Sequence, residues 1–301
     1  MVFQIVKGWL GHVGAAPEDK QGFGPIVKVL VAALVLVVPV YFLLSESDVL
    51  GVLLIVMMLG LTGWFVYSGF ASGSREQLHR YIAMLILFAA NILFWALFEQ
   101  AGSSLNFLAR DYVEMPTVFG SQLDFTIFQS ANPIFILMFA PIFAAMWVKL
   151  DKADWNPSIP RKFAYGLAGA AIGFYVLVFA IEHFDGANGK ISWAWLALTY
   201  LIHTLGELCI SPIGLAMVTK LAMPKETGLA MGGWFLSIAM ANFVAGRIAA
   251  IAAGGGSGHE AAGSLAAYSD VFNQMFWLGI AIALAFFLFA PLINKLMHGV
   301  K

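Results

Sequence analysis

Two acidic side chains lie inside long apolar stretches of this sequence, where a carboxylate needs a partner or water. Glu99 follows the run NILFWALF, and Glu207 stands within LIHTLGELCISPIGLA. A charge at the centre of a bilayer costs about 2.5–3.5 kcal/mol on insertion scales, so an acid inside a membrane is by default functional. Asn91, Trp95 and Glu99 are spaced i, i+4, i+8, which aligns an amide, an indole and an acid on one helix face. A structural role, as an acid hydrogen-bonded to a neighbouring helix, is the alternative for Glu99.

The second acid has a similar setting. His203, Glu207 and Ser211 repeat the i, i+4, i+8 spacing, and Pro212 removes one backbone hydrogen bond and lets this helix bend. The two acids therefore predict a polar cavity between two membrane helices. His203 and Glu207 are one turn apart, but a catalytic zinc needs three protein ligands and the HExxH spacing is missing. We therefore expect no metal site here and interpret His203 as a polar core residue.

Four further side chains are candidates for the cavity or for its packing. Asn132 precedes Pro133 inside an apolar run, where its amide satisfies backbone groups that the proline frees, contacts a ligand, or does both. Gln129 lies one turn earlier on the same face. Trp234 stands in the middle of an apolar helix, away from the interfaces where membrane tryptophans anchor, so packing and ligand contact both remain open. Trp95 is interpreted as a packing residue.

Composition places the chain among membrane proteins. Of its 301 residues 61% are hydrophobic and 11% are charged, and its 26 Phe and 9 Trp suit contact with lipid and with the interfaces. The net charge of −1 gives no basis for nucleic acid binding. The single cysteine, Cys209, rules out an intramolecular disulfide. No catalytic triad, phosphate loop or dinucleotide fingerprint occurs, so we expect no enzyme and no organic cofactor.

The apolar runs predict eight membrane crossings in an all-α fold. A polar linker, 1–24, precedes them, and the stretches ASGSREQLHR, KLDKADWNPSIPRK, MPKE and GGGSGHEAAG are interpreted as loops. The expected spans are 25–44, 49–70, 81 to about 108, 125–148, 163–181, 191–221, 227–253 and about 268–296.

The basic residues give this topology a direction. With the amino terminus in the cytoplasm, thirteen of the 16 Lys and Arg residues fall in cytoplasmic segments. Outer loops hold Arg110 and Lys190, and Arg247 lies near the outer end of a helix. Because positive charge accumulates on the cytoplasmic side, both termini are expected in the cytoplasm, most simply at a bacterial inner membrane.

Four of these stretches carry a resemblance to a known family. FWALFEQAGSSL and GELCISPIGLAMVTKLA resemble the seventh and tenth helices of proton-dependent oligopeptide transporters, which belong to the major facilitator superfamily. FQSANPIFILMFAPIFAAMW resembles the eighth helix, and GGWFLSIAMANFVAG the eleventh. The acidic ExxER-type motif that opens the amino-terminal half of that family does not occur. The chain thus resembles the carboxy-terminal six-helix bundle, 71–301, preceded by the two accessory helices, 25–70, that bacterial members carry.

The resemblance implies a function and a set of roles. It implies half of a proton-coupled di/tripeptide symporter with protons as the coupling ion, in which Glu207 binds the amino terminus of the peptide. Asn132 would contact the peptide backbone, Trp234 would line a side-chain pocket, and Glu99 would meet the peptide amino end or a lysine of an absent amino-terminal half. Gln129 and Ser211 complete the expected substrate site. The alternative is a truncated, non-transporting membrane protein that binds peptides or acts as an assembly partner.

Overall fold

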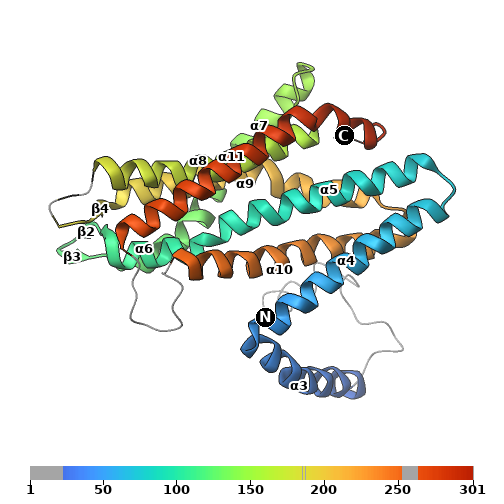
Figure 1. Cartoon of the computed structure of the whole chain (residues 1–301), viewed down its shortest axis with the longest axis horizontal. Coiled ribbons are helices and arrows are strands. Elements are labelled where there is room, and N and C mark those ends of the chain that lie inside the picture. The colour runs from blue at the N-terminus through green and yellow to red at the C-terminus, as the bar shows by residue number, and fades with distance from the viewer. Residues whose placement is uncertain (1–22, 185, 187, 253–263, 301) are drawn as a thin grey trace, which may run out of the picture. The chain divides into compact units, whose positions relative to one another are not determined.

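The computed structural model describes residues 23–184, 186, 188–252 and 264–300, and these residues are mainly helical (Figure 1). Eight segments among them are long and apolar enough to cross a membrane, which agrees with the expected number. The main helices are α3 (Phe23–Ser45), α4 (Ser47–Ala71), α5 (Arg75–Phe98), α6 (Ser104–Tyr112), α7 (Ala131–Lys152), α8 (Ile159–His183), α9 (Trp193–Leu221), α10 (Thr227–Ala252) and α11 (Leu265–Leu296).

The chain divides into two compact units, Met1–Leu53 and Leu54–Lys301, and the division falls inside α4. In the first unit, α3 is a 23-residue apolar helix that contains Pro39. It begins at Phe23, so the last two residues of the expected 1–24 linker belong to the helix; the rest of that linker lies outside the described residues. Glu46 alone separates α3 from α4, where a four-residue turn was expected.

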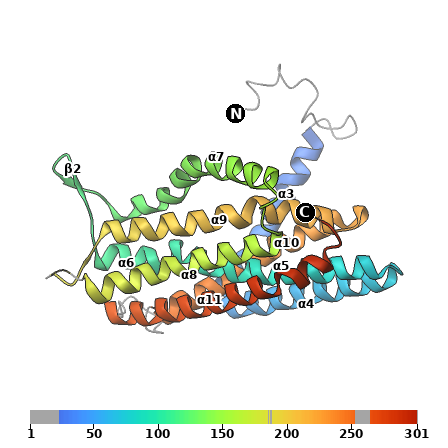
Figure 2. The same cartoon turned by 90° about the horizontal axis from the view of Figure 1, so that it is seen from above.

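In the second unit, α8 forms the centre of a helical bundle. It packs against α9 on one side and α11 on the other, while α5 packs mainly against α10 and also contacts α8. Figure 2 shows α7 arching along the outside of α9, away from the other helices. Within α7, which is described throughout, no residue is fully buried.

Small residues let α8 and α9 approach closely. A methyl group added at Gly166 would lie 2.8 Å from the carbonyl oxygen of Gly206, and one added at Gly169 would lie 3.1 Å from the Gly206 Cα. Farther along, the same reasoning applies to Gly173, where the added methyl would meet the His203 ring. Close backbone approach through small residues is a common way for membrane helices to associate, because lipid supplies no hydrophobic drive between them.

The longest expected helix is broken. The sequence predicts one helix from 81 to about 108, but α5 starts earlier, at Arg75, where the Ser74 side chain caps the helix by accepting from the Gln77 backbone N–H. α5 then ends at Phe98 and a 3₁₀ segment, η2 (Glu99–Gly102), leads into α6. Residues 75–80, expected in a loop, therefore form the first turns of α5. Residues 149–152, also expected in a loop, form the last turn of α7.

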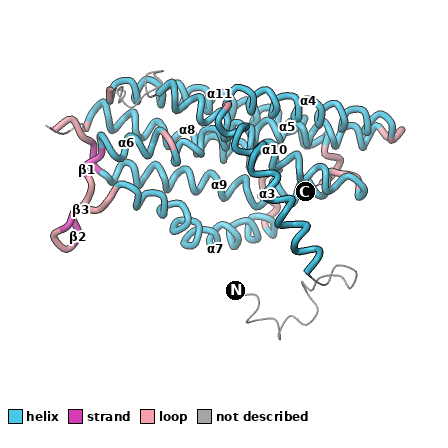
Figure 3. The backbone as a smooth tube through the Cα atoms, turned by 90° about the horizontal axis from the view of Figure 1, so that it is seen from below, coloured by secondary structure: helices cyan, strands magenta, loops and turns pink. Residues whose placement is uncertain are grey.

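Short strands close one end of the bundle (Figure 3). β1 (Val113–Glu114) pairs in parallel with β4 (Ile191–Ser192), and β2 (Thr117–Val118) pairs antiparallel with β3 (Ser121–Gln122). A second 3₁₀ segment, η3 (Phe125–Ser130), precedes α7 where the sequence predicted the start of a span. The β1–β4 pair joins two loops that the charge pattern assigns to the same side of the membrane.

At the other end of the bundle, contacts join segments that the charge pattern assigns to the opposite side of the membrane. The Gln77 amide donates to the Leu221 carbonyl oxygen at 3.0 Å, and Nδ1 of His79 lies 2.9 Å from Nε2 of His298. A short segment, η4 (Pro224–Glu226), brings Glu226 to Ser68 of α4. The segments predicted on the second side therefore lie together.

Candidate functional site

Glu99 owes its position to the break between α5 and α6. Gln100 supports the break from inside: its amide donates to the carbonyl oxygens of Ala96 and Ala245 at 3.0 and 3.2 Å, and its Oε1 accepts from Ser104 at 2.6 Å. Gln100 is fully buried, whereas Glu99 stays partly exposed. Irregular backbone at membrane depth is tolerated where it is buried in protein or lines a cavity. At this break the buried side chain is Gln100, and the partly exposed side chain is Glu99.

Asn91 and Trp95 do not share the setting of Glu99. Asn91 is fully buried and its amide donates to Ser237 of α10 at 2.7 Å. The Trp95 ring packs edge-to-face against Phe94 and Phe98. The expected face of amide, indole and acid is therefore divided between the core and the open side.

Asn132 and Glu207 form the central contact between α7 and α9. The Asn132 amide donates to Oε2 of Glu207 at 2.8 Å and to the Thr204 hydroxyl at 3.2 Å. Thr204 in turn donates to the Tyr200 carbonyl oxygen at 2.7 Å. The amide is thus held by two residues one turn apart on α9, and its own carbonyl oxygen remains an acceptor for another molecule.

The two acids lie within electrostatic range of one another. Asn242 of α10 lies within hydrogen-bonding reach of the Glu99 carboxylate. In the described part of the chain neither Glu99 nor Glu207 has a salt-bridge partner. Two partly buried carboxylates without a cation form a site with an affinity for positive charge.

Gln129 lies at the edge of this cluster, on η3. Its amide donates to the Ala101 carbonyl oxygen at 3.0 Å and to Oδ1 of Asn106 at 3.1 Å. Gln129 therefore ties the segment before α7 to the break that carries Glu99. Ser211 lies one turn beyond Glu207 on α9, and its hydroxyl is buried without a hydrogen-bond partner among the described residues.

Trp234 packs in the core. Its side chain is 4% exposed and lies edge-to-face against Phe88 and Phe163. A methyl group added at Gly214 of α9 would meet the indole at 2.1 Å, so the ring fills the space that this glycine leaves. Of the two interpretations left open by the sequence, packing is the one that these contacts support.

His203 has the role expected of a polar core residue. Its Nε2 lies 2.9 Å from the Ala170 carbonyl oxygen, and its ring lies against Phe174. Within the described ranges, no group of three or more His, Cys, Asp or Glu side chains has the arrangement of a metal site.

Sequence reasoning missed three polar partners of the cluster: Thr204, Asn242 and Asn106. Thr204 had a signal, since it precedes Glu207 by three residues and so shares its helix face. Asn242 is a lone amide in the apolar run AMANFVAG. Asn106 follows the helix break, so its direction was not predictable from a continuous helix.

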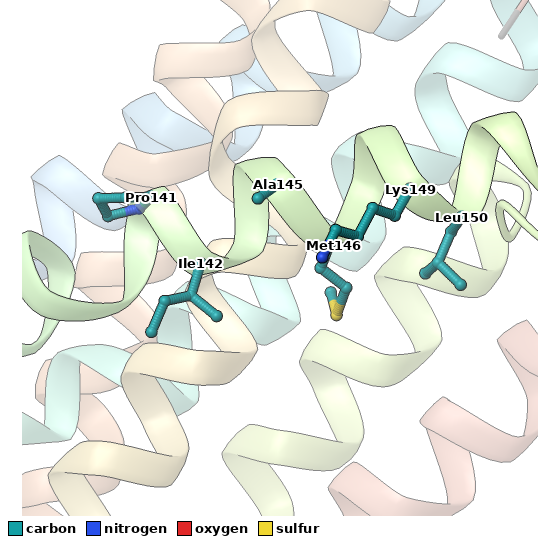
Figure 4. Close-up of a pocket in the computed structure, with 6 residues that line it drawn as sticks. All are labelled: Pro141, Ile142, Ala145, Met146, Lys149 and Leu150. Atoms are coloured by element: carbon teal, nitrogen blue, oxygen red, sulfur yellow. The ribbon is translucent and has the colours of Figure 1, made fainter.

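A separate open groove of about 640 Å³ runs along α7 (Figure 4). All six lining residues come from α7: Pro141, Ile142, Ala145, Met146, Lys149 and Leu150. The predicted site residues are not among them, so this groove is a surface of α7 rather than part of the polar cluster.

Comparisons with known proteins identify the class of membrane protein. The chain is 33% identical over 291 residues to the peptide transporter YePEPT of Yersinia enterocolitica, covering 94% of this chain and 55% of that protein. It is also 33% identical over 299 residues to the dipeptide and tripeptide permease A of Edwardsiella piscicida, covering 99% and 60%. The chain therefore spans little more than half the length of the curated relatives it matches.

The fold leads to the same class. A crystal structure of the peptide transporter POT in complex with sulfate matches 98% of this chain and 59% of that chain, with a TM-score of 0.76 and 30% identity. A POT family transporter in complex with 5-aminolevulinic acid matches 92% and 55%, with a TM-score of 0.69 and 26% identity.

The POT family model matches residues 26–263, and the chain belongs to that family. The resemblance found in the sequence is thereby confirmed, as is the architecture of a helical transporter bundle preceded by two further membrane helices. The protein is a membrane protein of a transporter family and not an enzyme.

Proposed function

We propose that this chain is the carboxy-terminal half of a proton-coupled di/tripeptide symporter. The relatives named as peptide transporters and as dipeptide and tripeptide permeases support the substrate class. The observation that carries the proposal for the site is the Asn132–Glu207 contact, at 2.8 Å, between α7 and α9. Glu99, on the break after α5, lies within electrostatic range of Glu207 and supplies a second acid.

This cluster suits the chemistry of a short peptide. A free peptide has an ammonium group, and Glu207 offers it a carboxylate that no described cation neutralises. Asn132 fixes the direction of that carboxylate through its N–H and retains its carbonyl oxygen for a peptide N–H. Transporter sites of this kind lie near the bilayer midplane, where reduced dielectric screening strengthens the attraction.

Glu99 is proposed as the second acid of the site, meeting either the peptide amino end or a basic side chain of the opposing half. Its place on a helix break between Asn242 and the open side supports this role. Gln129 and Ser211 border the same substrate site. Trp234 is proposed to support the site through α9, whose Gly214 it contacts.

The proposed transporter has a second, amino-terminal half of six helices. α7 has no buried residue and carries an open apolar groove, which supports a second bundle packed against this helix. Alternating access needs two bundles that rock around a midplane site. Protons are the proposed coupling ion, with no metal or organic cofactor, and the bacterial relatives and the charge pattern support an inner-membrane protein with both termini in the cytoplasm.

The substrate role of Glu207 is tested by Glu207→Gln, which keeps the size of the side chain and removes its charge. Binding is measured on the chain joined to the amino-terminal half of a relative, with dialanine and with N-acetyl-dialanine. Because a charge-assisted hydrogen bond contributes roughly 1.5–3 kcal/mol, we expect about ten- to a hundredfold weaker binding of dialanine.

The acetylated peptide lacks the ammonium group and should bind poorly to both forms. Glu182→Gln, at an exposed position near the end of α8, is the matched control and should leave both affinities unchanged. If the Glu207→Gln form still distinguishes free from acetylated peptide as the parent does, Glu207 is not the residue that meets the ammonium group.

A further inference from the structure

We propose that the end of the bundle where α4 turns into α5 and α11 terminates binds one anionic phospholipid of the adjacent membrane leaflet. A basic hollow would hold its phosphate, and a neighbouring apolar groove would hold part of an acyl chain. The proposal stands apart from the peptide site, which is built from α7, α9 and the break after α5.

The basic hollow lies over the α4–α5 turn. It has a volume of about 490 Å³, and its lining includes Phe70, Ser74, Arg75 and His79. Arg75 is exposed and has no ion-pair partner among the described residues. A guanidinium group matches a phosphate with two parallel hydrogen bonds, which makes an arginine without a partner a suitable group for a phosphate ester.

The charge around the hollow favours an anion. Arg80 forms an ion pair with Glu76 at 2.6 Å, so this acid is already engaged on the helix. Lys295 adds a second basic group from the last turn of α11. Glu226, another acid at this end, accepts hydrogen bonds from Ser68 and Tyr81, whereas Arg75 and Lys295 have no ion-pair partner among the described residues.

A histidine pair fastens the two helices at this point. Nδ1 of His79 and Nε2 of His298 are 2.9 Å apart, and the rings are nearly parallel, with 12° between their planes. Since His79 also lines the hollow, the contact brings the end of α11, with Lys295 one turn before His298, to the hollow's edge.

A separate apolar groove lies between the same two helices, α5 and α11. It has a volume of about 250 Å³ and is lined by Ile86 and by α11 residues that include Phe286, Phe289, Leu292 and Leu296. Its lining is apolar throughout. Ile86 follows His79 by seven residues, so the two share a face of α5 and lie about 10 Å apart along its axis.

This order of groups corresponds to an amphiphile rather than to a free ion. A phosphate held by Arg75 at the membrane surface has its glycerol and acyl chain directed into the hydrocarbon, along the face that leads to Ile86. Basic groups at the ends of membrane helices attract anionic lipid headgroups. A soluble phosphate would use the hollow and leave the groove without a function.

The test measures lipid retained by the purified full chain in detergent, by native mass spectrometry. The probes are palmitoyl-oleoyl phosphatidylglycerol, the matching phosphatidylcholine, dihexanoyl phosphatidylglycerol and inorganic phosphate. We expect one long-chain phosphatidylglycerol per chain. Arg75→Gln should weaken its binding by about tenfold, the effect of losing one charge-assisted contact. Leu292→Trp, which fills the groove, should also weaken it.

Lys152→Gln, at an exposed basic position at the end of α7, is the matched control and should retain the parent's affinity. Arg75 is exposed, so its substitution leaves the fold intact. Equal binding of phosphatidylglycerol by the Arg75→Gln form and the parent would overturn the proposal. Equal binding of phosphatidylcholine would overturn its charge selectivity. If inorganic phosphate or the short-chain lipid displaces the long-chain lipid at similar concentration, the site is for free phosphate and the lipid assignment is wrong.

Discussion

Three acids that are at least partly buried, Glu99, Glu207 and Glu226, have different hydrogen-bond partners. Glu226 is 7% exposed and accepts hydrogen bonds from the hydroxyl groups of Ser68, at 2.7 Å, and Tyr81. Glu207 has one described amide donor, and Glu99 lies near one amide. Because buried carboxylates are costly unless hydrogen-bonded, Glu226 is interpreted as a structural acid, while Glu99 and Glu207 retain capacity for a ligand.

Glu226→Gln should therefore destabilise the fold without affecting peptide selectivity. The variant loses the charge that strengthens the hydrogen bonds from Ser68 and Tyr81, which join α4 and α5 to the turn before α10. We expect a loss of about 1–3 kcal/mol in the free energy of unfolding, measured by thermal unfolding in detergent beside Glu182→Gln. An unchanged unfolding temperature would show that the contact does not hold the α4 end to the bundle.

The sequence predicts Glu99 and Glu207 as candidate site residues because each interrupts an apolar run, and hydropathy alone detects such an interruption. The structural acid was interpreted as part of a tight turn. Its partner Ser68 is 158 residues away in the chain. Likewise, the contact of Asn132 with Glu207 joins residues 75 apart, and no local pattern specifies such a pair. Trp234 shows the same limit, since its burial depends on a glycine in another helix.

At the scale of the elements, the contact of α8 with α9 controls the position of Glu207. Gly206 precedes that acid directly, and its backbone lies against Gly166 and Gly169 of α8. Where the backbones of two helices touch, an added side chain can be accommodated only if the helices themselves move apart. A change at this contact is therefore transmitted to the polar cluster.

Gly166→Ala tests this contact. The new methyl group would lie 2.8 Å from the Gly206 carbonyl oxygen and 2.4 Å from Cδ1 of Ile210, so the helices must separate. Overpacking of this kind costs about 1–3 kcal/mol, and we expect a lower unfolding temperature together with weaker peptide binding. Gly228→Ala, where nothing lies within 4 Å, is the control and should leave both unchanged. Parent-like behaviour of the Gly166→Ala variant would mean that α8 and α9 are not held at this distance.

The helices themselves were largely predictable, and the break between α5 and α6 was not. Length and apolar content identify each span, because a bilayer requires about 20 apolar residues. The run from Asn91 to Ala109 has the composition of a continuous helix, with Gly102 and Ser103 as its weak signals. The break is supported by the long-range hydrogen bond from Gln100 to Ala245, which sequence reasoning cannot anticipate.

At the scale of the whole molecule, the two ends of the bundle agree with the charge pattern. The loops expected on one side meet in the β1–β4 pair, and those expected on the other meet through Gln77, His79 and Glu226. The chain spans 55–60% of YePEPT and of the Edwardsiella piscicida permease. The proposed amino-terminal bundle is expected to pack against the exposed length of α7.

The most direct measurement is dipeptide uptake into liposomes, driven by a proton gradient. Two preparations are compared: the chain alone, and the chain joined to the amino-terminal six helices of the Edwardsiella piscicida permease. We predict accumulation by the joined protein that depends on the gradient and is lost in its Glu207→Gln form. We predict none by the chain alone, because one bundle cannot alternate access. Gradient-driven accumulation by the chain alone, or binding without any uptake by the joined protein, would contradict the account.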